Sequence, residues 1–323
     1  MKAPRWSVML LLLGVLALAF GVATLDTFPI GAAVDDAMYV ILGKSIAFGH
    51  GYRSLNVPGA PPNTHFPPGY PAVLALIWRM APDFPGNVVW FKSLNVACFV
   101  ISAIGMARFA ASLRIGRRWS LAMGVLAAIS VPVLVLVALM LSEPLFLALI
   151  VFLLPALEQF VNAPAGEPPS AARAVMLGVG IGLCTLVRSH GIVLIPSMML
   201  VLGVKRRWRD AGLVAGAAVL CLLPWQLYSA RHAGMVPAPL LGGYDSYTAW
   251  WIRGFREMGV AMVPRTLGRT VPEAAGMFAA LFSPVRGVFA HAITIAALVV
   301  LAIAGYVSSW RRIPVTLLFL VAY

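Results

Sequence analysis

Residues 131–154 read VPVLVLVALMLSEPLFLALIVFLL, an apolar stretch in which Glu143 is the sole charged residue. A turn at Ser142-Glu143-Pro144 divides it between two longer apolar runs, 120–140 and 143–160. A helix needs about 20 apolar residues to cross the hydrocarbon core of a bilayer. The two runs therefore predict neighbouring membrane spans joined by a tight turn that carries an acid.

The rest of the chain continues this pattern. Of its 323 residues, 61% are hydrophobic and 11% are charged, against about 25% charged in soluble domains. A soluble globule cannot hide so much apolar surface, so lipid is the expected solvent. The net charge of +13 does not indicate a nucleic-acid partner. The basic residues stand in short clusters between apolar runs, which is typical of cytoplasmic membrane loops.

Hydropathy predicts an all-α polytopic membrane protein with one transmembrane domain over residues 1–323. A ninth run, 313–323, is too short to span, and the sequence ends inside it at Tyr323. The eight predicted spans are 7–25, 89–111, 120–140, 143–160, 172–188, 190–204, 211–229 and 287–308.

The Lys/Arg bias of the loops orients these spans. With Lys2 and Arg5 in the cytoplasm, every dense basic cluster falls on the cytoplasmic side, and the outer loops are 26–88 and 230–286. The clusters are Arg114–Arg118, Lys205–Arg209 and Arg311–Arg312. The expected location is therefore an inner membrane that the chain crosses many times, with a cytoplasmic N-terminus.

Two segments leave other topologies open. The apolar run Tyr70–Met80 is short for a span, which favours an interfacial or re-entrant helix; counting it as a span would move Arg114–Arg118 outside. Arg188 interrupts the run 174–204. One long helix there would bury Arg188 in the membrane at a cost of several kcal/mol, so two short helices are expected. Residues 37–48 predict a further helix that lies flat on the membrane.

Only eleven residues are acidic, and this topology puts three of the candidates for chemistry, Asp35, Asp36 and Glu143, on the same outer face. Acids brought together from separate loops suit a general-base site, in which one carboxylate takes a proton from an acceptor hydroxyl and a second orients the acceptor or holds a metal. Simple structural roles compete with this interpretation. Asp35 is a plausible helix N-cap, Asp36 complements a helix dipole, and Glu143 is placed to cap its own turn.

Cations and aromatic residues accompany these acids on the outer side. Arg188 suits a lipid phosphate, since its planar guanidinium offers several donors, although a snorkelling anchor is the competing role. Arg231 admits the same two interpretations. His65 with Asp36 and Glu143 is the candidate metal set, and a divalent metal stays open. The further pocket candidates are Tyr70, His190 and Tyr244.

Three segments of the first outer loop resemble the corresponding loop of the GT-C superfamily of membrane glycosyltransferases. They are Asp35-Asp-Ala-Met-Tyr39, Gly49-His-Gly-Tyr52 and Phe66-Pro-Pro-Gly-Tyr-Pro71. Leu141-Ser-Glu-Pro-Leu-Phe146 looks like the family's second outer loop. Gly178–Gly191 is similar to its glycine-rich helix ending in an Arg-x-x-Gly turn. The family includes protein O-mannosyltransferases and the aminoarabinose transferase of lipid A.

The resemblance implies a GT-C-like bundle with juxtamembrane helices in the first outer loop, in a bacterial inner membrane. It implies inverting transfer of a sugar from a polyprenyl-phosphate donor to a lipid, glycan or protein acceptor on the periplasmic or extracellular face. Asp35 would be the base, Asp36 and Glu143 would support it, and Arg188 with Arg231 would bind the donor phosphate. The rival hypothesis is a flippase or transporter of a lipid-linked saccharide.

Overall fold

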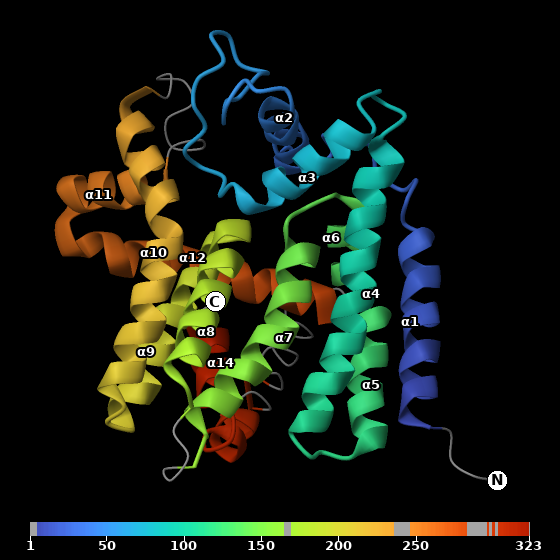
Figure 1. Ribbon diagram of the computed structural model, residues 1–323, viewed down its shortest axis with the longest axis vertical. Coiled ribbons are helices and arrows are strands. Elements are labelled where there is room, and N and C mark those ends of the chain that lie inside the picture. The colour runs from blue at the N-terminus through green and yellow to red at the C-terminus, as the bar shows by residue number, and fades with distance from the viewer. Residues whose placement is uncertain are drawn as a thin grey trace.

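The computed structural model describes residues 5–164, 169–235, 246–282 and 303–322, with isolated residues between 296 and 300. Within these ranges the chain is mostly helical and has no strand, so the prediction of an all-α protein is confirmed for the described part. The helices form an upright bundle, with two further helices lying across one end of it (Figure 1).

Among the described residues, three helices are long and apolar enough to cross a membrane: α4 (Val88–Ser112), α7 (Glu143–Val161) and α10 (Trp208–His232, continued by a short turn to Met235). They correspond to the predicted spans 89–111, 143–160 and 211–229, which are confirmed as helices of spanning length. Their apolar side chains continue onto the outside of the bundle, as lipid contact requires.

The predicted span 120–140 is not one continuous helix. It is divided into α5 (Arg117–Ala128) and α6 (Val131–Ala138), which meet at a bend of 45° and make a fourth crossing only if counted together. Pro132, in the first turn of α6, has no N–H to continue α5, so the helix ends before it.

The remaining apolar runs form shorter helices. The predicted spans 7–25, 172–188 and 190–204 correspond to α1 (Trp6–Val22), α8 (Ala171–Val187) and η1 with α9 (Ser189–Val193, Leu194–Val204). The helical run 174–204 is therefore interrupted at Arg188, between α8 and η1. This is the expected arrangement of two short helices. Residues 313–323 contain α14 (Pro314–Ala322), while most of the predicted span 287–308 lies outside the described residues.

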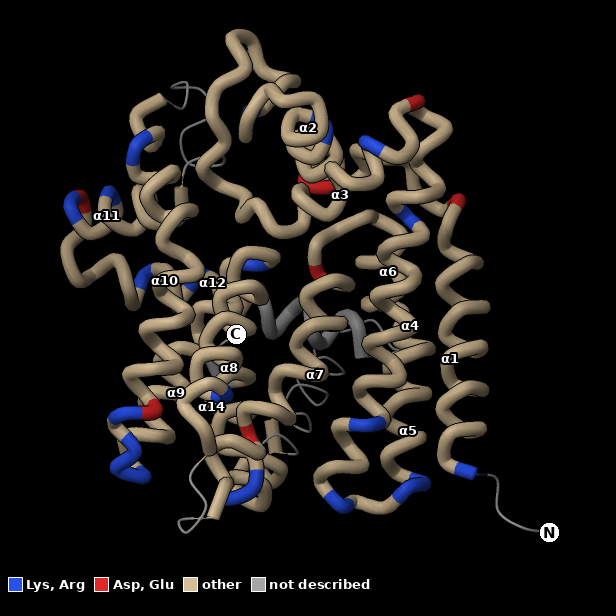
Figure 2. Tube along the Cα trace, viewed as in Figure 1, with Lys and Arg blue, Asp and Glu red and all other residues tan. Residues whose placement is uncertain are grey.

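The two ends of the bundle differ in charge. Lys and Arg gather where α1 begins and at the α4–α5 and α9–α10 connections, at the lower end in Figure 2. The opposite end carries the helices of the first predicted outer loop, α2 (Asp35–Ala47) and α3 (Gly69–Met80). This separation agrees with the sidedness that the basic clusters predict.

Close packing of α8 on α10 depends on glycine. A Cβ on Gly178 would overlap the carbonyl oxygen of Val214, and one on Gly182 would lie 2.6 Å from the Cβ of Cys221. Helices in lipid associate through such small residues, which allow the backbones to approach. The contact fixes the position of α8, and therefore of Arg188 at its C-terminal end.

The α2–α3 pair covers the end of the bundle with a small apolar core. Trp78 donates a hydrogen bond to the carbonyl of Val40 (2.9 Å), and Gly43 allows α2 to approach Leu74 closely. The other predicted outer loop, 230–286, contains α11 (Tyr247–Met258) and α12 (Met262–Phe282), which lie beside α10.

Candidate functional site

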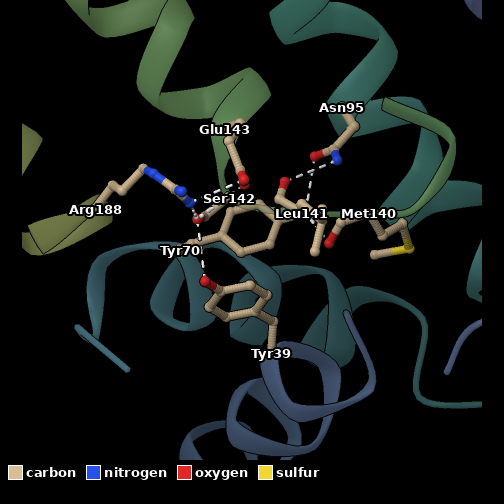
Figure 3. Close-up of polar contacts among 8 residues, drawn as sticks. All are labelled: Tyr39, Tyr70, Asn95, Met140, Leu141, Ser142, Glu143 and Arg188. Atoms are coloured by element: carbon tan, nitrogen blue, oxygen red, sulfur yellow. Dashed lines mark hydrogen bonds and ion pairs between the residues drawn. The ribbon is translucent and has the colours of Figure 1, made fainter. Parts of the chain in front are cut away.

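A polar cluster lies where α2 meets the N-terminus of α7 and the C-terminus of α8 (Figure 3). Nη1 of Arg188 is 3.0 Å from Oε1 of Glu143, and both side chains are partly buried. The hydroxyl of Ser142, which is fully buried, accepts a hydrogen bond from Arg188 (3.5 Å) and is paired with the hydroxyl of Tyr39 (3.1 Å). Burial raises the pKa of Tyr39 to about 12, so its phenol stays neutral. Three segments far apart in sequence therefore converge on one ion pair.

A buried network of hydrogen bonds holds the turn that carries Glu143. Tyr70 on α3 donates a hydrogen bond to Oδ1 of Asn95 (2.8 Å) and lies 3.3 Å from the carbonyl oxygen of Met140. Asn95 in turn donates to the carbonyl of Leu141 (3.1 Å). Tyr70 is fully buried, so it positions the turn rather than lining an open pocket.

Arg188 is held by the break between α8 and η1. It is the C-cap residue of α8, where a cation complements the helix dipole. Its carbonyl accepts the N–H of Gly191 (2.9 Å), and a Cβ on Gly191 would lie 2.8 Å from the backbone nitrogen of Thr185. The Arg-x-x-Gly turn therefore needs glycine for steric reasons.

Gly69, in the Phe66–Pro71 motif, sets the distance between α3 and α8. A Cβ there would lie 2.6 Å from the carbonyl oxygen of Leu186, 2.8 Å from its carbonyl carbon and 2.9 Å from the nitrogen of Val187. All three are backbone atoms, so no side chain can rotate away. The residues immediately before Arg188 therefore rest directly on the start of α3.

Gly69→Ala is expected to destabilise the protein by about 1–3 kcal/mol, the usual cost of overpacking, because α3 must move away from α8. Thermal unfolding in detergent measures this. Gly86→Ala is the control, since its Cβ would come no closer than 3.4 Å to any neighbour and its loop lies in the same end of the molecule. Equal melting temperatures for the two variants would contradict the close approach.

Asp35 is the first residue of α2 and is solvent-exposed. The expectation that it caps this helix is wrong: the N-cap position belongs to Val34, and no side chain makes the capping bond. Val34 adopts φ 64° and ψ −57°, and the N–H of Asp35 bonds back to the carbonyl of Ala33 (2.7 Å). This is the strained, positive-φ form of the γ-turn, which is rare for a β-branched residue and typical of functional sites.

The surroundings of Asp35 link it electrostatically to the cluster. Although solvent reaches Asp35, the protein around it partly desolvates its carboxyl and raises the pKa above the ordinary value; the nearby charges of His65 and Arg188 lower this pKa, and Asp36 raises it further. The burial effect is the largest. Asp35 therefore shares its environment with Arg188 without being ion-paired to it by any contact in the described residues.

Asp36 has a structural role. Its side chain is completely buried, and its two carboxylate oxygens accept the N–H groups of Gly31 and Ala37 (2.8 Å each). Nearby, Lys92 of α4 donates to the carbonyls of Leu25 and Phe28. These bonds fix the segment that leads into Asp35.

The other candidates are distributed around this cluster. His65 is half-buried and packs edge-on against Phe66 at 4.8 Å, and His190 is exposed in η1. Arg231 is exposed near the end of α10, and no contact among the described residues joins it to the ion pair. Tyr244 lies outside the described residues.

The candidate metal set is not assembled. Within the described part of the chain, no three His, Cys, Asp or Glu side chains are grouped so that they would hold a metal ion. Asp36 faces backbone amides, and Glu143 faces Arg188. Asp36, His65 and Glu143 therefore do not form the set that the sequence left open.

Sequence reasoning missed Tyr39, Asn95 and Ser142. Asn95 carried a signal, since it is an amide inside the apolar run 89–111, where an unpaired polar group is costly. Tyr39 and Ser142 belong to the segments Asp35–Tyr39 and Leu141–Phe146 that resemble the GT-C loops, but nothing in the sequence indicates that their hydroxyls meet.

No protein-family model, curated protein or solved structure matches this chain. The fold and site define a helical protein whose described part has three or four helices able to cross a membrane, with a polar cluster at the less basic end of the bundle. Its likeness to membrane glycosyltransferases rests on the sequence motifs alone.

Proposed function

We propose that this protein is a GT-C-type membrane glycosyltransferase, which moves a sugar from a polyprenyl-phosphate donor to a hydroxyl of a lipid, glycan or protein acceptor. The observation that carries the proposal is the Glu143–Arg188 ion pair at the end of the bundle where Asp35 begins α2, since the charge of Arg188 acts on the carboxyl of Asp35. An exposed carboxylate beside a guanidinium supplies the two groups that displacement at a phosphorylated anomeric carbon needs.

In the proposed reaction, Asp35 takes the proton of the acceptor hydroxyl as that oxygen attacks the anomeric carbon. The bond from this carbon to the phosphate oxygen breaks, and the polyprenyl phosphate leaves with the bonding electrons. Direct displacement inverts the anomeric configuration. Arg188 stabilises the charge on the leaving phosphate through charge-assisted hydrogen bonds, and Glu143 orients the guanidinium.

A flippase or transporter of a lipid-linked saccharide is the alternative, and the break between α8 and η1 beside Arg188 favours it. Transporters place substrates at such discontinuous helices. The exposed acid is the feature that favours the enzyme, because moving a lipid across a bilayer requires no base.

The test is a transfer assay with the full chain in liposomes, using polyprenyl-phosphate monosaccharides labelled in the sugar. We expect the label to leave the lipid and unglycosylated polyprenyl phosphate to accumulate in equal amount when envelope lipids and glycans are supplied as acceptors. Protein-free liposomes are the control. Label that crosses the bilayer while still attached to its lipid, without release of polyprenyl phosphate, would identify a transporter instead.

A further inference from the structure

A polar cavity of about 230 Å³ lies beside the ion pair, between the loop before α3, the η1 turn and helices α10 and α11. Its lining includes Thr64, His65, Ser189, Trp225, Gln226 and Trp251. At roughly 30 Å³ for each liquid water molecule, the space suits one sugar ring rather than a chain of them.

The cavity adjoins the groups assigned to the reaction. His65, in its wall, acts electrostatically on the carboxyl of Asp35, and Ser189 directly follows Arg188 in the chain. A group bound there therefore lies next to Ser189, the neighbour of the proposed phosphate-binding residue, and to His65, which acts on the proposed base.

The wall is built from elements that are tied together. The hydroxyl of Tyr228 on α10 donates to the carbonyl of Tyr52 (2.7 Å), which in turn donates from its own hydroxyl to the carbonyl of Phe66 (2.8 Å). The amide of Asn63 accepts the backbone N–H groups of His65 and Phe66. The loop that carries Thr64 and His65 is therefore held against α10, and the cavity is preformed.

The chemistry of the wall combines aromatic rings with uncharged polar groups. Trp225 stacks on Tyr228 at 5.7 Å, and Trp251 stacks on Phe255 at 5.6 Å, so both indole rings are held in place. Rings of this kind pack on the apolar C–H face of a sugar, while hydroxyls and the amide of Gln226 pair with its hydroxyl groups.

Among the described residues that line the cavity there is no Asp, Glu, Lys or Arg. These lining residues offer the charged group of an amino sugar or a uronic acid no opposite fixed charge in place of its lost hydration, which is costly in a partly enclosed site. A neutral sugar meets no such penalty.

We propose that this cavity binds the sugar of the donor, and that this sugar is an uncharged monosaccharide. The inference rests on the proposed function, which supplies the donor, but it is tested by binding as well as by transfer. It assigns Gln226 and Trp251 to sugar recognition and Arg188 to the phosphate.

The experiment measures binding to the full chain in nanodiscs, with four lipids of equal chain length: polyprenyl phosphate alone, and the same lipid carrying a neutral hexose, a cationic amino sugar or an anionic uronic acid. Gln226→Ala and Trp251→Phe are compared with matched controls at distant sites, Gln159→Ala on α7 and Trp119→Phe on α5. Gln226 and Trp119 are exposed, so these changes leave the core intact.

We expect the neutral hexose lipid to bind most tightly. Gln226→Ala should weaken it roughly two- to tenfold, the value of one neutral hydrogen bond. Trp251→Phe should weaken it by about as much, because the smaller ring covers less of the sugar face. Neither change should alter the affinity for polyprenyl phosphate alone. Unchanged binding of the hexose lipid in both variants would overturn the assignment of this cavity to the sugar. Tighter binding of a lipid with a charged sugar would overturn the inference that the sugar is uncharged.

Parallel transfer measurements separate the two proposals. Hexose binding that depends on Gln226, without transfer to any acceptor, would support the cavity and contradict the enzyme. Transfer that neither variant alters would support the enzyme and contradict the cavity.

Discussion

Asp35→Asn is expected to lower kcat for sugar transfer by about 10²–10⁴-fold, the usual contribution of a general base, while the protein keeps its fold. The amide has nearly the same shape as the carboxyl but takes no proton at neutral pH. The parent should show a rate that rises with pH as Asp35 ionises, and the variant should lose this dependence. Initial rates from acid to neutral pH measure both effects.

The same substitution should not reduce stability at neutral pH. Burial raises the pKa of Asp35 in the folded protein above its unfolded value near 3.8, so ionisation opposes folding. The parent is therefore expected to lose stability as pH rises from the unfolded pKa through the folded one. Asn removes this loss, so Asp35→Asn should melt at or above the parent temperature at pH 7.

Asp83→Asn is the matched control, an exposed acid in the loop that follows α3. It should change neither the rate nor its pH dependence. Near-parental transfer by Asp35→Asn would remove Asp35 from the role of base, and a lower melting temperature would indicate that its carboxylate stabilises the fold.

The sequence predicted the long helices well because apolar length is a local property. α4, α7 and α10 begin and end within three residues of the predicted spans. The division of 120–140 at Pro132 was overlooked, because hydropathy averages over a residue whose effect is on backbone geometry. The short helices around Arg188 were expected, since the cost of burying that charge argues directly for a break.

The site was predictable only in part. The resemblance pointed to Asp35 as the base, with Asp36 and Glu143 in support and Arg188 at the phosphate, but nothing in the sequence shows that Asp36 is buried while Asp35 is exposed. That distinction depends on the γ-turn at Val34, which exposes one carboxylate and buries its neighbour. The hydrogen bond between Tyr39 and Ser142 joins residues 103 positions apart and follows from tertiary packing alone.

Arg188→Ala is expected to raise the KM for the polyprenyl-phosphate donor by about ten- to a hundredfold, the value of a charge-assisted hydrogen bond. It should also destabilise the protein by about 1–3 kcal/mol, since Glu143 is left partly buried without its partner. Steady-state kinetics over donor concentration and thermal unfolding measure the two effects. Arg79→Ala is the control, since this exposed arginine of α3 donates to the carbonyl of Ala47 and has no assigned role at the phosphate.

The double variant Arg188→Leu with Glu143→Leu separates a functional ion pair from a structural one. Replacing both partners of a buried pair by apolar groups often restores stability, because neither charge is left unpaired. We therefore expect the double variant to melt near the parent temperature. Its donor KM should stay as high as in Arg188→Ala, because leucine offers a phosphate no hydrogen bond. Recovery of donor affinity together with stability would mean that the guanidinium only joins α8 to α7, and the phosphate site would then have to lie elsewhere.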